Sequence, residues 1–159
     1  MDRSNAPERG DQEVADLAAH AEKGHAALMR GDLDTYFTHV SISDDFMLMA
    51  PFGGEPTRGG DLTSERWAAV GRFFAHGRQA SSQLLHAWRC GDMVVLATIE
   101  RAHVEVGGLA GQDWALRVTL VFRRQQGRWW LVHRHADPLV DGIGMEQAAA
   151  LARGAAVIP

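Results

Sequence analysis

A change of hydrophobic period near residue 80 constrains this chain more than any other feature of its sequence. Before it, apolar residues recur with the spacing of amphipathic helices. After it, four stretches alternate apolar and polar residues as half-buried strands do, at about 80–90, 93–106, 113–125 and 128–137. Glycine-containing turns separate these stretches. The pattern predicts an α+β domain, with helices first and an antiparallel meander of long strands after them.

Three helices are expected in the first half of the chain. The first starts at Asp11 and ends at Gly31, which suits a helix C-cap. The second follows Asp32, whose side chain suits an N-cap. A short apolar strand at 46–50 and a loop rich in glycine and proline lead to a third helix at about 63–77.

Length and patterning predict one domain with a hollow interior. The 159 residues fit a single core, and no internal repeat or linker divides them. We expect a disordered segment at 1–10, the folded domain at 11–140, and a turn, short helix and tail at 141–159. Long strands with one apolar face curl around helices, which predicts a cone with a cavity between the sheet and the first helices.

Composition excludes several classes of partner. The net charge of −4 gives no basic surface, which argues against nucleic acid. No apolar run approaches the roughly 20 residues of a membrane span, and the polar start MDRSNAPERG lacks a signal core. With a single cysteine, Cys90, these features predict a cytoplasmic protein.

The last strand carries the candidate chemistry. If it alternates regularly, Trp129, Leu131, His133, His135 and Asp137 share one face. Imidazole suits proton transfer near neutral pH, so His133 and His135 are interpreted as a candidate acid/base pair in the cavity. The alternative is that one histidine ties the strand end to a backbone carbonyl and the other is solvated.

His25 is the third catalytic candidate, because it lies on the apolar stripe of the first helix. It either donates to a substrate oxygen or is a satisfied core histidine. Two histidines on one face also suit Zn²⁺, but no metal-binding spacing is present, so neither a metal nor another cofactor is predicted.

Two stretches resemble the nuclear-transport-factor-2-like superfamily, which includes ketosteroid isomerases, SnoaL-like cyclases and the kinase association domain. One runs from Gly31-Asp32-Leu33-Asp34 through Asp44-Asp45 to Pro51 and its glycine loop; the other is the W-x-x-x-H-x-H pattern at 129–135. With the order of elements, the resemblance covers roughly 11–138. It implies a cone-shaped α+β barrel in which helices pack on a strongly curved, mostly antiparallel sheet.

The resemblance does not extend to the isomerase residues. The general-base aspartate of ketosteroid isomerases corresponds to Ala50, their phenol to Gly24 beside His25, and their second acid to a position near Thr119. Ketosteroid isomerase activity is therefore not expected.

Two functions stay open at the level of sequence. One is a cofactor-independent SnoaL-like enzyme that moves protons on a hydrophobic carbonyl compound. The other is a non-catalytic homodimeric domain for ligand binding or assembly, joined through the outer sheet face where Trp130 and Val132 are expected. In either case an apolar pocket is predicted to bind a small hydrophobic molecule. Its expected ligand-binding residues are Trp67, Trp114, Trp129, Tyr36, Met47, Met49 and Phe74.

Overall fold

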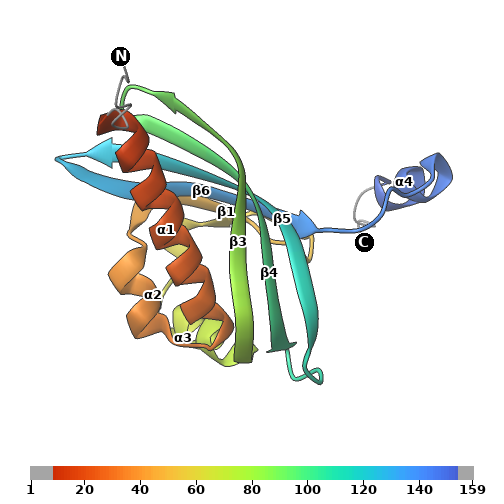
Figure 1. The fold of residues 1–159 in the computed structure, drawn as a ribbon. Helices are drawn as coiled ribbons and strands as arrows, with labels where there is room; N and C mark the ends of the chain where they lie inside the picture. Colours follow the sequence, from red (N-terminus) through yellow and green to blue (C-terminus); the bar gives the residue numbers. More distant parts are fainter. Residues whose placement is uncertain (1–8, 154–159) are drawn as a thin grey trace, which may run out of the picture.

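The computed structural model describes residues 9–153, and three helices form one layer of it (Figure 1). These are α1 (Arg9–Met29), α2 (Leu33–His39) and α3 (Ser64–Phe73), with a 3-10 turn, η1 (Gly59–Asp61), before the third. Helix α1 packs against β3, β4 and α2, so it is the element that covers the sheet. Of the lead-in predicted at 1–10, Arg9 and Gly10 belong to α1, and residues 1–8 lie outside the described residues, as do 154–159 of the predicted C-terminal segment.

The second layer is a curved, six-stranded sheet in the order β2-β1-β6-β5-β4-β3 (Figure 1). Its strands are β1 (Ile42–Met49), β2 (Thr57–Arg58), β3 (Phe74–Cys90), β4 (Met93–Val106), β5 (Gln112–Gln125) and β6 (Arg128–Pro138). Only β1 and β6 pair in parallel; all other neighbours are antiparallel. The predicted α+β cone is confirmed, and the sheet is mixed and open rather than closed into a barrel.

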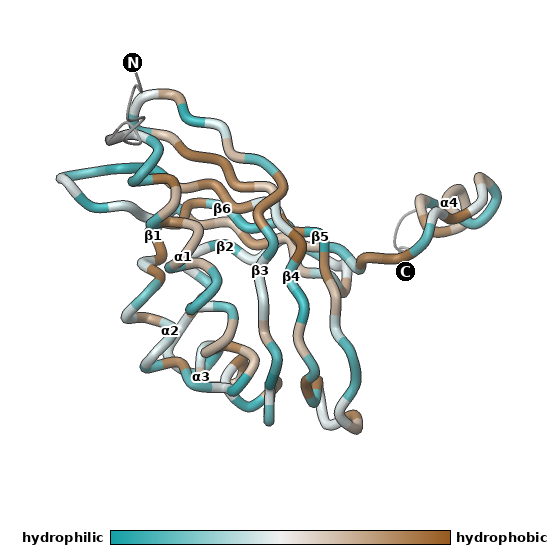
Figure 2. The backbone as a smooth tube through the Cα atoms, in the orientation of Figure 1, coloured by the Kyte–Doolittle hydropathy of each residue, from teal (hydrophilic) through white to brown (hydrophobic). Residues whose placement is uncertain are grey.

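The core lies between α1 and the sheet face turned toward it, which we call the inner face. Alternate residues of β4 and β5, such as Val94, Leu96, Val118 and Leu120, point inward and are buried. Figure 2 shows hydrophobic residues concentrated in these central strands. The period-2 pattern of the sequence therefore determines which side of the sheet meets the helices.

Helix α3 ends earlier than predicted, at Phe73, and the chain turns directly into β3. Gly77, expected at the end of the helix, is instead a strand residue within the register shift between Ala75 and Arg78. A side chain there would overlap the backbone carbonyl of Met29, the last residue of α1. The glycine is required by close packing of β3 against α1, not by a helix end.

Gly31 has the role the sequence predicts, because it follows α1 with φ of +70°. Its N–H donates to the carbonyl of Leu28 at 2.9 Å. A Cβ at this position would also overlap the carbonyl oxygen of Gly71 in α3. One glycine thus serves both the turn and the approach of α3 to the end of α1.

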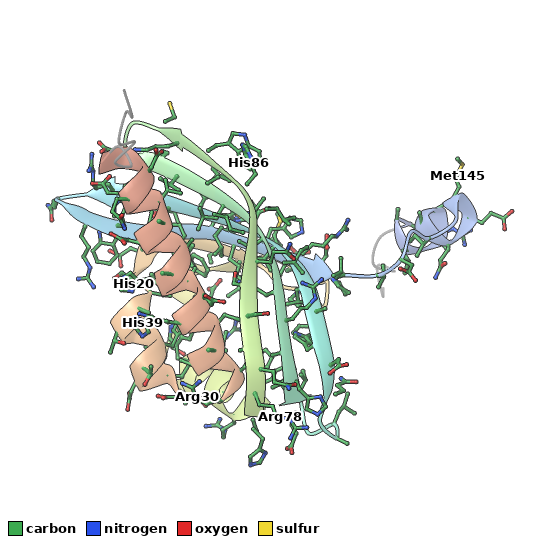
Figure 3. The ribbon with its side chains drawn as sticks, viewed as in Figure 1. His20, Arg30, His39, Arg78, His86 and Met145 are labelled. Carbon is green, nitrogen blue, oxygen red and sulfur yellow. The ribbon has the colours of Figure 1, made fainter. Side chains whose placement is uncertain are left out.

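The C-terminal segment stands away from the body of the domain. After β6, a turn leads to α4 (Met145–Leu151), which Figure 1 shows projecting beyond the sheet. Met145, labelled in Figure 3, is 88% exposed. None of the residues of α4 is buried, so this helix contributes nothing to the core of the domain.

Candidate functional site

A cavity of about 360 Å³ lies between the three helices and the inner face of the sheet. Its walls are almost entirely apolar. They are formed by Leu28, Met29, Tyr36, Phe46, Leu48, Ala50, Pro51, Phe52, Leu62, Trp67, Ala69, Val70, Phe73, Phe74, Trp114, Leu116 and Arg134. The volume lies within the roughly 300–1,000 Å³ typical of small-molecule sites.

Four of the seven residues expected to bind a ligand line this cavity. Tyr36 reaches it from α2, Trp67 from α3, Phe74 from the start of β3 and Trp114 from β5. Tyr36 and Trp67 lie near each other, with ring centroids 6.0 Å apart. Aromatic side chains from both layers of the fold therefore contribute to the wall of one cavity.

The two methionines of β1 do not line the cavity. Leu48 pairs in register with Arg134, whereas Met47 and Met49 pair with His133 and His135. Since paired residues share a face of the sheet, Leu48 points inward and both methionines point outward. The prediction for Met47 and Met49 had the wrong face of the strand.

Trp129 faces inward but lies beyond the cavity, toward the other end of β6. It packs against the core, and the guanidinium carbons of Arg124 and Arg89 lie 5.5 and 5.9 Å from its ring centroid. Its surroundings are those of a cation–π cluster at the rim of the sheet.

The expectation that His133 and His135 share a face with Trp129 and Leu131 is wrong. Leu131 pairs with Phe122, but His133 pairs with the preceding residue of β5, Val121. Val132 is therefore an extra residue in β6. Such a bulge reverses the direction of every side chain beyond it.

Beyond the bulge, Arg134 points inward and the two histidines point outward. The ring of His133 donates through Nδ1 to the carbonyl of Met47 at 2.9 Å. His135 pairs with Thr119 and is exposed beside the ion pair of Asp137 and Arg117. Neither histidine lines the cavity.

Arg134 forms a buried charge pair with Glu100 on β4. Its two terminal nitrogens donate to the two carboxylate oxygens at 2.8 and 2.7 Å. Glu100 is only 2% exposed. Burial raises the pKa of Glu100, but Arg134 and then His25 outweigh it and hold that pKa below its ordinary value. The carboxylate is ionised at neutral pH.

His25 of α1 completes the cluster. It is 5% exposed, its Nε2 lies 3.1 Å from the carbonyl oxygen of Arg101, and its Nδ1 lies 3.3 Å from Oε2 of Glu100. A second, smaller cavity of about 40 Å³ is lined by His25, Tyr36, Glu100 and Arg134 among apolar side chains. That volume has room for a water molecule or one small polar group.

The small cavity abuts the large one, because Leu28, Tyr36 and Arg134 line both. Burial raises the pKa of Tyr36 to about 12, so its phenol is a neutral hydrogen-bond donor. The site is thus an apolar chamber whose wall includes a phenol and a guanidinium, and Glu100 and His25 line the small cavity that adjoins it.

Sequence reasoning missed Glu100 and Arg134. Glu100 had a visible signal, since it follows Leu96 and Thr98 at period 2 on a strand whose alternate residues are apolar. Arg134 had none, because only the bulge at Val132 turns it inward.

The positions that correspond to isomerase residues are also placed. Ala50 lines the cavity without a polar group. A Cβ on Gly24 would lie 2.7 Å from a methyl group of Val40, so a larger side chain there requires Val40 to move. Thr119 pairs with His135 on the outer face.

Two other histidines meet outside this site. His20 and His39 lie side by side between α1 and α2 (Figure 3), with their Nδ1 atoms 3.1 Å apart. Within residues 9–153, no three side chains of His, Cys, Asp or Glu gather into a group able to hold a metal. Over the same range, no helix has both the length and the apolarity to cross a membrane.

Several solved structures share this architecture. An NTF2-like protein from Cytophaga hutchinsonii has a TM-score of 0.63 and 17% identity over 84% of this chain and 100% of its own. The CaMKII hub homology domain of Chlamydomonas reinhardtii has a TM-score of 0.62 and 20% identity, over 80% of this chain and 99% of its own. A candidate dehydratase of the NTF2-like family from Streptomyces avermitilis has a TM-score of 0.64 and 19% identity, over 83% of this chain and 99% of its own. The fold is that of the nuclear-transport-factor-2-like superfamily.

The sequence narrows this class to one family. Residues 18–141 match the SnoaL-like domain, which is more than half of the chain, and the protein belongs to that family. No curated protein has a significantly similar sequence.

Proposed function

We propose that this SnoaL-like domain binds an apolar small molecule with an oxygen-bearing end. The observation that supports it is the cavity itself, whose largely apolar wall includes Tyr36 and Arg134. A neutral phenol and a guanidinium both donate hydrogen bonds, so they suit a carbonyl or other acceptor oxygen. The apolar remainder of the ligand would pack against Trp67 and Trp114.

The geometry favours binding over proton transfer. Stabilisation of an oxyanion needs preorganised donors, which Tyr36 and Arg134 supply. Proton transfer also needs a base within reach of the substrate. Among the described residues, no carboxylate or histidine lines the large cavity, and Glu100 is held by Arg134. His25 is the one predicted catalytic residue near the site. It lies against Glu100 rather than in the large cavity, so its role would be to hold that carboxylate in position.

Two neighbouring residues of β1 give a matched test. Leu48→Trp fills the cavity from its wall, whereas Met47→Trp places the same side chain on the opposite face. Titration of 2-acetylnaphthalene by isothermal calorimetry should show binding to the wild type and to Met47→Trp, and its loss in Leu48→Trp. Circular dichroism checks that both variants fold.

Two results would contradict the proposal. Equal loss of binding in both variants would mean that the ligand site is elsewhere, and no binding to the wild type would remove its basis. A third measurement addresses chemistry: the methyl protons of 2-acetylnaphthalene should exchange with D₂O no faster with the protein than without it. Faster exchange would instead establish proton-transfer catalysis.

A second function, self-association through the outer sheet face, is supported by the exposed apolar surface there. Leu85 and Trp88 of β3 are 56% and 54% exposed. Pairing places Trp88 beside Val95, and Val95 beside Val121, so the apolar surface extends across three strands. Exposed surface of this kind typically marks an interface, and one structural relative is a hub homology domain. We propose a homodimer joined through this face.

Sedimentation velocity tests the dimer. Trp88→Glu should convert the dimer to a monomer, because it places a charge within this exposed apolar surface. Leu109→Glu, at an equally exposed position in the turn between β4 and β5, should leave it dimeric. A monomeric wild type, or a dimer that Trp88→Glu does not affect, would rule out this interface.

A further inference from the structure

The small cavity next to the large one offers both a hydrogen-bond acceptor and hydrogen-bond donors. Its volume is about 40 Å³, and its polar lining consists of His25, Tyr36, Glu100 and Arg134. A cavity of this size accommodates a group about as large as a water molecule. A hydroxyl group matches that size, whereas a ring does not.

Glu100 supplies the acceptor. Its carboxylate is 2% exposed, and among the described residues both of its hydrogen bonds come from Arg134, one to each oxygen. A carboxylate has about four acceptor sites on its two oxygens. Nδ1 of His25 lies 3.3 Å from Oε2, so it faces the other oxygen than Oε1. Oε1 therefore keeps free capacity to accept a hydrogen bond.

Tyr36 and Arg134 supply the donors. A guanidinium has five N–H donors, and the pair with Glu100 uses two of them. The phenol of Tyr36, with its pKa raised to about 12 by burial, carries its hydrogen at neutral pH. Both residues line the large cavity as well as the small one. A ligand group that passes from one cavity to the other therefore meets these donors and the carboxylate of Glu100.

A hydroxyl group is the small neutral group that matches this combination. It has one O–H donor and two acceptor lone pairs. A carbonyl or ether oxygen can only accept, so against Glu100 it would leave two acceptors with no hydrogen between them. Such a contact is unfavourable in a buried site, where no solvent replaces the missing hydrogen bond.

We propose that the oxygen-bearing end of the ligand is a hydroxyl group, so that the cavity binds an apolar alcohol. This rests on the proposed function and specifies it, since it states the chemical class of the molecule that the cavity binds. The hydroxyl enters the small cavity, donates to Glu100 and accepts from Tyr36 or Arg134. The apolar remainder stays in the large cavity, against Trp67 and Trp114.

Calorimetry with a ketone and its alcohol tests this assignment. The ketone is 2-acetylnaphthalene, and the alcohol, 1-(2-naphthyl)ethanol, has the same carbon skeleton and one hydroxyl in place of the carbonyl. We expect the tighter enantiomer of the alcohol to bind about tenfold or more tightly than the ketone, because only the alcohol donates to a carboxylate.

Two alanines of α1 give matched variants. Ala21 is 7% exposed and lines the small cavity but not the large one. Ala21→Val should reduce the room for the hydroxyl, so the preference for the alcohol should fall to about twofold or less while the ketone binds as before. Ala18→Val adds the same atoms on the same helix, at a position that lines neither cavity, and should keep the full preference. Circular dichroism checks that both variants fold.

The outcomes separate this inference from the function on which it rests. If the wild type binds the two ligands equally, or the ketone more tightly, the inference is overturned and the binding function stands. If neither ligand binds, both fail. A preference that survives intact in folded Ala21→Val would place the hydroxyl outside the small cavity and overturn the assignment to Glu100. Should Ala21→Val not fold, the wild-type comparison still decides, because a ligand that only accepts cannot use the free site on Glu100.

Discussion

Replacing Arg134 with methionine isolates the buried charge pair on which the site depends. The substitution keeps an unbranched apolar stem and removes both hydrogen bonds to Glu100. The carboxylate, 2% exposed, then keeps only His25, with its Nδ1 3.3 Å away. Removing one partner of a buried pair costs about 3–5 kcal/mol. Since His25 still compensates part of the charge, we expect a loss near the lower end, about 3 kcal/mol.

Urea unfolding at neutral pH measures this loss, and Arg117→Met is its matched control. Arg117 also makes a two-bond pair on the same sheet, with Asp137, but the two side chains are 63% and 41% exposed. Exposed pairs contribute little because solvent screens them. Arg117→Met should therefore cost far less than Arg134→Met. Combining Arg134→Met with Glu100→Leu should recover most of the loss, since no unpaired carboxylate then remains.

The pH dependence gives a second check with a definite sign. In the wild type, the lowered pKa of Glu100 contributes stability above the ordinary carboxyl pKa of 4.5, and this is lost as pH falls through the folded-state pKa. Without Arg134, burial dominates and raises the pKa of Glu100, so the carboxyl is protonated more readily. The deficit of Arg134→Met should shrink as pH falls from 7 to about 5. Equal losses for Arg134→Met and Arg117→Met, or a deficit that grows on acidification, would refute this account of the pair.

Three further predictions concern the elements that hold the site. Gly31→Ala should destabilise the domain by more than the roughly 1–2 kcal/mol that a positive φ costs a residue with a side chain, because its Cβ would also overlap Gly71. Gly127→Ala is the control in the same urea assay: it has φ of +74° but open space around it, so it should cost only the free energy of the positive φ. Asp32→Ala should lower the melting temperature, because it removes the side-chain oxygen that accepts from the N–H of Thr35. Asp32→Asn keeps such an oxygen and should retain most of the wild-type stability. Tyr36 is the sole tyrosine, so ultraviolet titration should show one phenol ionising near pH 12 in the folded protein and near 10 in urea; ionisation near 10 in both would place Tyr36 in solvent.

The sequence was sufficient for the architecture because the fold depends on repeated patterns. Alternation along β4 and β5 determines the inner face, and the glycine after α1 has the positive φ that a C-cap requires. The predicted end of α3 was wrong. A glycine such as Gly77 can end a helix, but here it allows a strand to pass close to Met29. A glycine in a sequence can mark either close packing or an unusual backbone conformation, and the sequence alone does not say which.

The site was harder to predict, because one extra residue in β6 decides which side chains enter the cavity. With regular alternation, His133 and His135 face inward; with the bulge at Val132, Arg134 does. Nothing in the local sequence marks that bulge. Glu100 could be recognised from the sequence as a buried carboxylate. Its role as one half of a charge pair could not, because its partner Arg134 faces inward only as a result of the bulge.

The indole N–H resonances of the five tryptophans test the central claim most directly. Two of them, Trp67 and Trp114, line the cavity, whereas Trp88 and Trp130 lie on the outer face and Trp129 lies beyond the cavity on the inner face. On addition of 2-acetylnaphthalene, with peaks assigned through single Trp→Phe variants, the resonances of Trp67 and Trp114 should shift. The other three should stay in place. Shifts confined to Trp88 and Trp130 would contradict a ligand site beneath the helices and place binding on the outer face of the sheet.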